Sequence, residues 1–579
     1  MKKRPLSGCA KKAADLKAQK SEIPSEEKSE SEYSDQDSAL NKSTSEIKIA
    51  GNLDSYSCDN EHGFLPVDTQ LLCGYLDSVV LCQQCHGPVK TYPNWKNGNG
   101  YQVPFVGKCD SCQIEMLLFS SSERCDKSDL LDSCVSRRPY EINVRCVTFA
   151  REIGKGHSCL QMLSTTLNSP TMSNDSYCGI FEKLYSSCKL VGQESMKCAA
   201  QELIEETESS DTMVSIDGSW QRRGHSSRNG VVTAVIVPTG KAVDIEVLSN
   251  YCRICDAHID NVHDHECNLN HEGSAGSMEG AGAVKIFHRS EEERSLRYLD
   301  YLGDGDTQAY KKVKDSNPYN EEVIKKKECI GHVQKRVGTR LRGLKNSNKG
   351  KKLDDGKPIS GAGRLTDKLI DSLQNYYGIG IRTNTHDLIS MQNAVYASLY
   401  HTASTDENPQ HDWCPDGETS WCGYKNGDPD FIHKHGIPHA ILELMEPIYD
   451  DLSNPDLLLK CLHGKTQNPN ENLHKLIWDR AIKEVFVSKR VVEQAALSAV
   501  AHFNDGSAAL IKILELMGVP PRHFTIEGCK RKDSRRLACA KSKSSDSGKR
   551  RRKQIRAAKK GFMDKKVQEE GPTYEKGGF

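Results

Sequence analysis

Residues 212–251 read "TMVSIDGSWQRRGHSSRNGVVTAVIVPTGKAVDIEVLSNY", and the predicted fold depends most on this segment. It holds three short runs of β-branched residues, separated by Arg/Gly/Ser turns and by "PTGK", which predict three antiparallel strands. Working outward, residues 276–293 ("GSMEGAGAVKIFHRSEEE") have a helical pattern, and residues 296–304 ("LRYLDYLGD") predict a fourth strand that runs into another helical segment. Three strands, a helix, a strand and a helix predict an α/β unit with a mixed sheet.

The remaining chain differs in composition from this unit. Residues 1–66 are rich in Ser, Glu, Lys and Asp, and their low apolar content predicts disorder. Spaced cysteines follow, and then apolar residues recur three and four apart, as in amphipathic helices. The predicted regions are a disordered acidic and Ser-rich segment (1–66), a zinc-ribbon-like unit (67–136), a helical segment (137–206), the α/β region with a helical insertion (207–480), C-terminal helices (481–528) and a basic disordered tail (529–579).

Composition narrows the class of protein. The 579 residues are only 36% hydrophobic, with a mean hydropathy of -0.62. No apolar run approaches the roughly 18 residues of a spanning helix, and the N-terminus lacks the apolar centre of a signal peptide. We therefore expect an intracellular protein with no membrane partner. The 23 cysteines are an odd number, so metal ligation explains the clustered ones better than a disulfide framework does.

The balanced net charge conceals a basic tail. Lys and Arg total 79, as do Asp and Glu, but residues 529–566 hold 17 basic residues against 3 acidic ones. The tail includes "KRRRK", which is Lys549, Arg550, Arg551, Arg552 and Lys553. Such a run predicts a nuclear import signal and a flexible arm that binds DNA phosphates by counterion release, without reading sequence.

Two cysteine clusters have the spacing of structural zinc sites. The first is Cys82, Cys85, Cys109 and Cys112, in which two Cys-x2-Cys pairs 23 residues apart supply four thiolates. The second pairs Cys252 and Cys255 with downstream ligands, and our preferred set is Cys252, Cys255, His265 and Cys267. Three further histidines compete for the nitrogen position of the second site: His258, His263 and His271.

A third cluster lies in the Gly/Pro/Cys-rich loop at residues 402–436. Its spacing permits a zinc site made by His401, His411, Cys414 and Cys422. A loop of this length usually needs a cross-link, such as a metal site, to hold one conformation. The alternative is a loop held by packing of Trp413 and Trp421.

Acidic residues end two of the predicted strands. Asp217 lies at the end of the first strand and Asp304 at the end of the fourth, so neighbouring strands would bring both carboxylates into one cleft. Oxygen ligands suit Mg²⁺ or Mn²⁺. Glu471, just inside a helix start marked by Asn468 and Pro469, is the candidate third acid.

Long collinear stretches of the chain resemble the Mutator-like transposase domain, a branch of the DDE transposases with a ribonuclease H-like core. The resemblance covers roughly residues 67–530. It is carried by "SIDGSWQRRGHSSRNGVVTAVIVPTGKAVDIEVLSNYC", "HECNLNHEGSAGSMEGAGA", "YLGDGDTQAY", "ECIGHVQKRVGTRLR", "GRLTDKLIDSLQNYYGIGIR", "PQHDWCPDGETSWC" and "CLHGKTQNPNEN".

The resemblance implies that residues 207–480 form a ribonuclease H-like catalytic domain with a large helical insertion before the last acid. It identifies Asp217, Asp304 and Glu471 as the catalytic acids that hold Mg²⁺ or Mn²⁺, with Asp306 as an alternative second acid. It also matches a pair, Cys329-x2-His332, to the Cys/His motif of related transposases. The implied protein is a nuclear, self-associating DNA transposase that binds terminal inverted repeats, cleaves phosphodiester bonds and joins the freed ends to target DNA.

The residues after Glu471 depart from the family pattern. The family usually has a small residue and then Asn, whereas this chain has Asn472, Leu473, His474 and Lys475. The alternative function is therefore a domesticated, catalytically inactive nuclear protein that binds DNA and depends on zinc.

Overall fold

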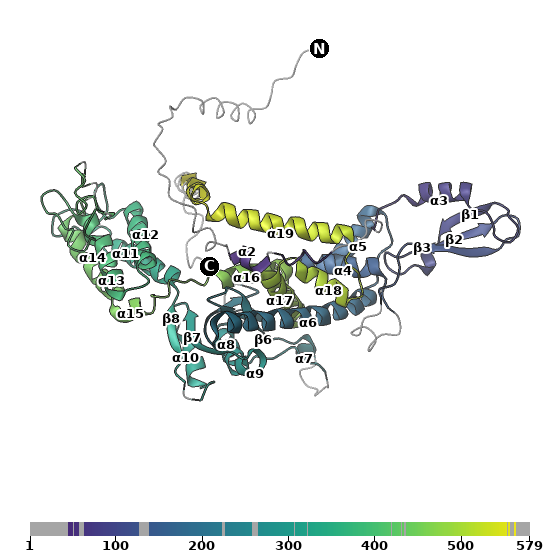
Figure 1. The fold of residues 1–579 in the computed structure, drawn as a ribbon, viewed down its shortest axis with the longest axis horizontal. Coiled ribbons are helices and arrows are strands. Elements are labelled where there is room, and N and C mark those ends of the chain that lie inside the picture. The colour runs from purple at the N-terminus through teal and green to yellow at the C-terminus, as the bar shows by residue number, and fades with distance from the viewer. Residues whose placement is uncertain are drawn as a thin grey trace, which may run out of the picture. The chain divides into compact units, whose positions relative to one another are not determined.

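The computed structural model describes most of the chain from Thr44 onward. The described residues are 44–49, 51–56, 63–126, 138–222, 226–257, 265–305, 307–320, 322–418, 420–429, 431–433, 436–552, 554–555, 558 and 561–562. They form a mixed α/β structure with two sheets, as the sequence predicts (Figure 1). No helix in this described part is long and apolar enough to span a membrane.

The larger sheet has five strands in the order β6-β5-β4-β7-β8. The predicted meander is confirmed, because β4 pairs antiparallel with β5 and β5 antiparallel with β6. β7 pairs parallel with β4, and β8 pairs parallel with β7. The strands are β4 (Asp211–Trp220), β5 (Asn229–Ile236), β6 (Ala242–Ser249), β7 (Arg297–Gly303) and β8 (Lys325–Glu328). β8 is not predicted from the sequence, because its residues "KKKE" have no apolar alternation and form an edge strand.

Helices cover both faces of this sheet. Along the fully buried strand β5, Val232, Ala234 and Ile236 belong to one core cluster, whereas Val231 and Val235 belong to another. This alternation follows from the period of two in a strand. Helix α8 contributes to the first cluster, α16 and α17 contribute to the second, and α6 contributes to both. The helices near the first face are α8 (Met278–His288), α9 (Ser290–Arg294) and α10 (Gln308–Asp315).

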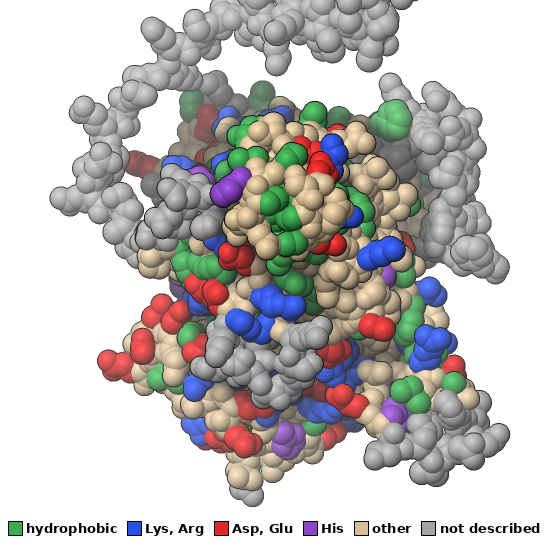
Figure 2. Space-filling model, turned by 90° about the vertical axis from the view of Figure 1, so that its right-hand side faces the viewer, with side chains coloured by type: hydrophobic (Ala, Val, Ile, Leu, Met, Phe, Trp, Pro, Cys, Tyr) green, Lys and Arg blue, Asp and Glu red, His purple; other side chains and the backbone are tan. Residues whose placement is uncertain are grey.

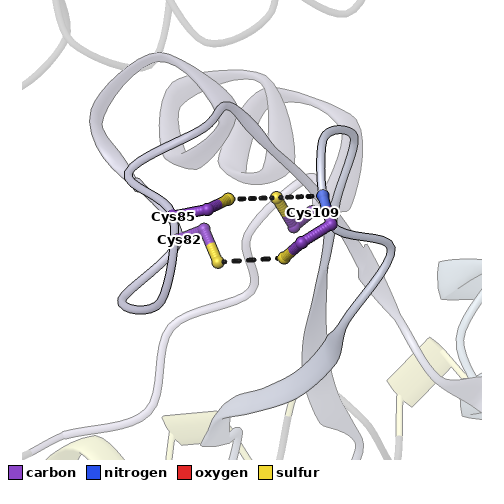
Figure 3. A group of neighbouring side chains, drawn as sticks. Cys82, Cys85 and Cys109 are labelled. Atoms are coloured by element: carbon purple, nitrogen blue, oxygen red, sulfur yellow. Dashed lines mark hydrogen bonds between the residues drawn. The ribbon is translucent and has the colours of Figure 1, made fainter.

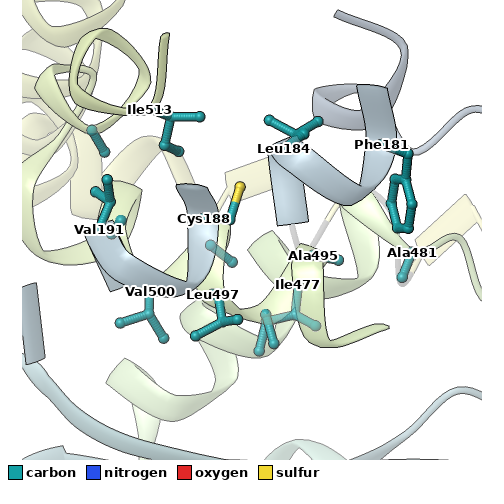
Figure 4. Close-up of a cluster of buried hydrophobic side chains, with 14 of the residues drawn as sticks. Phe181, Leu184, Cys188, Val191, Ile477, Ala481, Ala495, Leu497, Val500 and Ile513 are labelled. Atoms are coloured by element: carbon teal, nitrogen blue, oxygen red, sulfur yellow. The ribbon is translucent and has the colours of Figure 1, made fainter. Parts of the chain in front are cut away.

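The second face is covered by helices from distant parts of the sequence. Figure 4 shows Leu184 and Cys188 of α6 beside Ile477 of α16, Leu497 of α17 and Ile513 of α18. The segments at 137–206 and 481–528 therefore share one core. Its helices are α4 (Glu141–Glu152), α5 (His157–Leu167), α6 (Asn174–Thr207), α16 (Asn468–Arg480), α17 (Lys489–Asp505) and α18 (Ala508–Leu516).

Five helices between β8 and α16 have a core of their own. This helical block buries, among others, Val337, Tyr377, Leu399 and Tyr449 in a cluster distinct from those on the sheet. Its helices are α11 (Ile330–Ser347), α12 (Asp367–Thr383), α13 (Leu388–Ala403), α14 (His439–Leu452) and α15 (Pro455–Leu459).

The smaller sheet has three antiparallel strands in the order β1-β2-β3. They are β1 (Val89–Pro93), β2 (Pro104–Cys109) and β3 (Glu115–Ser120), and α3 (Thr69–Val79) packs against β1. Leu71, Tyr75 and Val79 of α3 are exposed. Figure 2 views the molecule from the side on which Figure 1 shows this sheet, with hydrophobic side chains visible at the surface.

Two stretches that were predicted to be disordered contain helices. Within residues 1–66, α2 spans Thr44–Ile49, and Ile49 and Leu53 are buried. Within the basic tail, residues 529–544 belong to α19 (His523–Ser544), which buries Ile526 and Cys529. The prediction was wrong there because composition does not register these few anchoring side chains. Residues 1–43 and most of the chain after Arg552 lie outside the described part.

Candidate functional site

Neighbouring parallel strands bring Asp217 and Asp304 together. Ser215 of β4 pairs with Leu302 of β7, so the same register places Asp217 opposite Asp304, which follows the last residue of β7. Adjacent strands are about 4.8 Å apart. Asp217 is not at the strand end as predicted, because β4 continues to Trp220. The alternative acid, Asp306, lies outside the described residues.

Helix α16 brings the third acid to the same edge. It begins at Asn468 as predicted, and Glu471 lies in its first turn. The Nδ2 of buried Asn470 donates to the carbonyl oxygens of Ser215, at 3.0 Å, and Thr233, at 3.1 Å. The Nε2 of Gln467 donates to the carbonyl oxygen of Ile216 at 2.8 Å. These bonds fix the start of α16 beside Asp217.

The electrostatics show that the acids act on one another. Burial, and then the charges of Glu279, Asp304 and Glu471, raise the pKa of Asp217 to about 8. Carboxylates gathered in this way ionise together only when a positive charge offsets their repulsion. The donor set therefore fits a hard divalent cation, which prefers carboxylate oxygens.

Glu279 is an acid of this site that sequence reasoning missed. It lies in the first turn of α8 and packs against Gly218, where an added Cβ would be 2.9 Å from the Cγ of Glu279. Glycine next to Asp217 therefore permits the close approach of Glu279. The only signal in the sequence was the predicted start of a helix directly after the second cysteine cluster.

His474 also contacts Asp217. Its Nδ1 is 3.5 Å from Oδ2 of Asp217, and its Nε2 is 3.0 Å from Oγ1 of Thr233. Burial, and then the charge of Lys483, lower the pKa of His474 to about 3, although a hydrogen bond to the backbone of Asp217 opposes this shift. The imidazole is therefore neutral at physiological pH.

A cleft of about 690 Å³ opens beside the acids. Asp217, Glu471 and His474 line it together with Lys475, Trp478 and Lys483. The Nε1 of Trp478 donates to Oγ of Ser219 at 2.8 Å, which ties α16 to β4 beyond Asp217. The cleft thus combines carboxylates with two lysines that can contact phosphates.

The Cys329/His332 pair lies where β7, α11 and α16 meet. Cys329 is buried and precedes α11, and its backbone N–H donates to the carbonyl oxygen of Gly303 at 3.0 Å. The backbone N–H of Gln467 donates to its Sγ at 3.4 Å. His332 lies on the first turn of α11. Cys329 therefore joins the segments that carry Asp304 and Glu471.

The first cysteine cluster is assembled in the smaller sheet (Figure 3). Its ligand atoms all lie within 4.8 Å of one another, with Sγ separations of 3.6 Å for Cys82 and Cys112 and 3.4 Å for Cys85 and Cys109. Tetrahedral zinc with Zn–S near 2.3 Å needs sulfurs roughly 3.8 Å apart. The four thiols thus fit a zinc ion.

The second cluster gathers the preferred ligand set around α7 (Arg253–Ala257). The Nε2 of His265 is 3.2 Å from Sγ of Cys252 and 3.5 Å from Sγ of Cys255, and Cys255 is 3.5 Å from Cys267. His271 is not part of the group, because its Nε2 is 2.8 Å from Oγ of Ser277. The other two competitors, His258 and His263, lie outside the described residues.

The third cluster is also assembled. Nδ1 of His401 is 3.2 Å from Nδ1 of His411, and Sγ of Cys422 is 3.4 Å from Nδ1 of His411. With Cys414 these atoms lie within 4.8 Å of one another, so two nitrogens and two sulfurs fit tetrahedral zinc. The alternative to a zinc site is a loop held by packing of Trp413 and Trp421, but these side chains are 41% and 59% exposed.

Ser404 and His433 extend the third cluster. The Nε2 of His411 is 2.9 Å from Oγ of Ser404 and 3.0 Å from Nε2 of His433, and Nδ1 of His433 contacts Asp406. Such outer partners fix which ring nitrogen faces a metal. The sequence spacing did not reveal them, because they contact a ligand and not the metal position.

Of the basic segment, Lys549 to Arg552 are described and helical, and Lys553 lies outside the described residues.

Comparison with protein families matches residues 68–422, more than half of the chain, to the family model described as Mutator-like transposase. The match includes Asp217, Asp304 and all three Cys/His clusters, and it ends before Glu471. No curated protein matches the chain.

Proposed function

The chain belongs to the Mutator-like transposase family, and we propose that it is a DNA transposase that binds the terminal inverted repeats of its element and catalyses metal-dependent cleavage and strand transfer. The observation that carries the proposal is the meeting of Asp217, Asp304 and Glu471 at one edge of the sheet. A sheet with this strand order and a helical block before the last acid supports a ribonuclease H-like core.

The three acids are proposed to hold Mg²⁺ or Mn²⁺. Two such ions, when bound, would supply activation of the attacking oxygen and stabilisation of the leaving oxygen. Asp217 and Asp304 offer oxygens from adjacent strands, and Glu471 offers its oxygens from α16. Water is the nucleophile for cleavage and a DNA 3′-hydroxyl is the nucleophile for joining, so no side chain forms a covalent intermediate.

Basic side chains support DNA as the substrate. Lys475 and Lys483 line the cleft beside the acids, where they can hold the phosphates that flank the scissile bond. Arg531 and Arg535 are exposed one turn apart on α19, and Lys549 to Arg552 continue the positive charge. We propose that this surface binds the backbone without reading sequence and that the basic segment directs the protein to the nucleus. Self-association would hold two element ends together.

The alternative is a domesticated DNA-binding protein that no longer cleaves. The departures from the family pattern support it, because His474 contacts Asp217 and Lys475 lines the cleft. Both functions use the same zinc clusters and basic surface. They differ in metal-dependent strand cleavage.

The test is cleavage of a labelled duplex that carries the element's own ends, in Mg²⁺ or Mn²⁺. We expect the wild-type protein to nick at the element ends, and Asp217→Asn, Asp304→Asn and Glu471→Gln to abolish nicking. DNA binding should persist in all three variants, because the acids are not the source of phosphate affinity. The matched control is Asp451→Asn, an exposed acid of the helical block. Binding of the ends without cleavage by the wild type would favour the domesticated protein.

A further inference from the structure

His474 occupies a position that connects three elements of the site. It lies on α16 one turn after Glu471, it is only 7% exposed, and its two ring nitrogens face different strands. Nδ1 faces Oδ2 of Asp217 on β4 at 3.5 Å, and Nε2 faces Oγ1 of Thr233 on β5 at 3.0 Å. The ring therefore contacts the Asp217 carboxylate and the Thr233 hydroxyl, and it also hydrogen-bonds to the backbone of Asp217.

The neighbouring side chains determine which nitrogen carries the proton. The Nδ2 of Asn470 faces the carbonyl oxygens of Ser215 and Thr233, which only accept hydrogen bonds, so the orientation of this amide is unambiguous. The same Nδ2 is also 3.0 Å from Oγ1 of Thr233, so its two hydrogens are shared among three acceptors. The Thr233 hydroxyl has a single proton and can therefore donate one hydrogen bond.

That proton has two possible acceptors. Nε2 of His474 is at 3.0 Å and the carbonyl oxygen of Asp217 is at 3.4 Å, so the imidazole is the closer one. If Nε2 accepts, the proton of a neutral ring is on Nδ1. When Asp217 is ionised, as a bound cation would make it, an Nδ1–H group points to Oδ2 of Asp217 as a donor, whereas a bare Nδ1 would set a lone pair against the carboxylate.

A donor on one oxygen of a metal-binding carboxylate orients that carboxylate. The Asp217 carboxylate also accepts a hydrogen bond from the backbone N–H of Gly218. With Oδ2 directed to His474 as well, the rotation of the side chain is restrained and the carboxylate is oriented for a cation shared with Asp304 and Glu471. Hydrogen bonds of this kind to metal ligands typically change metal affinity by about 10–100-fold.

We propose that His474 is a positioning residue for Asp217, held by Thr233 and Asn470 as the Nδ1–H tautomer so that it donates to Oδ2 and orients the carboxylate for a divalent cation. This inference rests on the proposed function, because it assigns Asp217 to cation binding. His474 departs from the family pattern, and this proposal gives it a role within the site. Under the alternative function, the same departure indicates that catalytic activity has been lost.

The first test reads the tautomer directly. In the full-length protein with ¹⁵N-labelled histidine, long-range ¹H–¹⁵N correlation spectra distinguish the two neutral tautomers, and the His474 signal is identified by its loss in His474→Asn. The spectra are recorded with saturating Mg²⁺, so that Asp217 is ionised, and we expect protonated Nδ1 in the wild type. Thr233→Val replaces the hydroxyl with a methyl group of the same shape and should allow the Nε2–H form. An Nε2–H tautomer in the wild type would overturn the proposal.

The second test measures Mn²⁺ affinity by electron paramagnetic resonance, without DNA. His474→Asn keeps a donor near the position of Nδ1 and should stay within a few-fold of the wild type, whereas His474→Leu should weaken binding at least tenfold. Thr233→Val should reduce the Mn²⁺ affinity by an intermediate amount. It keeps the proposal testable if His474→Leu does not fold. The Mn²⁺ site is identified by its loss in Asp217→Asn.

Wild-type affinity in His474→Leu, or Mn²⁺ binding that Asp217→Asn leaves unchanged, would overturn the proposal. Neither measurement depends on strand cleavage. A protein that binds DNA ends without nicking them would therefore refute the transposase function, while the tautomer and Mn²⁺ results would still decide the role of His474.

Discussion

Gly218 shows how one residue without a side chain shapes the acidic site. It follows Asp217 on β4, and the Cγ of Glu279 lies where a Cβ would force it away. We expect Gly218→Ala to destabilise the protein by about 1–3 kcal/mol, because the added methyl group must displace Glu279 or the strand. Chemical denaturation monitored by circular dichroism measures this.

The matched control for that substitution is Gly179→Ala. Gly179 lies in α6, and an added Cβ there meets nothing within 4 Å. Alanine favours a helix over glycine by about 1 kcal/mol, so the control should be stabilised. Equal effects of the two substitutions would show that Glu279 does not approach Gly218.

Among the helices, a buried ion pair joins α16 to α4. The Nη2 of Arg480 is 2.7 Å from Oε2 of Glu152, whose side chain is 17% exposed, and Oγ of Ser498 donates to the same carboxylate. Burial opposes ionisation, but His502, Arg480 and Ser498 outweigh it and lower the pKa of Glu152 to about 2. This pair anchors the C-terminal end of the helix that carries Glu471.

The lowered pKa sets the direction of a pH effect. Because the folded-state pKa of Glu152 lies below its ordinary value of 4.5, the ionised group contributes stability above pH 4.5. That contribution, about 3 kcal/mol, is lost as the pH falls from about 4.5 to about 2. We expect Glu152→Gln to lower the unfolding free energy by about 3–5 kcal/mol at pH 7, because it leaves Arg480 unpaired, and by less at pH 3.

Urea unfolding at several pH values would measure this difference. The control is Asp451→Asn, which removes an exposed pair with Arg340 and should change stability by no more than about 1 kcal/mol at any pH. A loss in Glu152→Gln that stays the same from pH 7 to pH 3 would contradict the role of the ionised carboxylate.

Among the residues that the structure describes, three separate Cys/His clusters predict bound zinc. Each has four ligand atoms within 4.8 Å, so we expect these clusters to hold three zinc ions. Cys82→Ser, Cys252→Ser and Cys414→Ser should each lower the content by one, as measured by inductively coupled plasma mass spectrometry. Cys539→Ser replaces an exposed cysteine outside the clusters and should retain all three. A content of two in the wild type would identify one cluster as metal-free.

The parts of the fold that sequence could predict are those with a local pattern. Cysteine spacing anticipated the three clusters, and alternating β-branched residues anticipated β4, β5 and β6. Strand β8 was missed because its residues, "KKKE", have no apolar alternation and its pairing with β7 is visible only in the structure. Glu279 was missed because its proximity to Asp217 arises from packing of α8 on the sheet.

The two ends of the helical block lie side by side. The backbone N–H of Glu328 donates to the carbonyl oxygen of Lys460 at 3.0 Å, and that of Ile330 donates to Lys465 at 3.3 Å. The block leaves the sheet and returns to it at nearly the same point, with its own core between. Because closing a longer loop costs little more entropy, such a block can grow, shrink or be exchanged without moving Asp304 or Glu471. The helical block is thus an exchangeable insertion. Its sequence and size can diverge during evolution while the geometry of the acids stays the same.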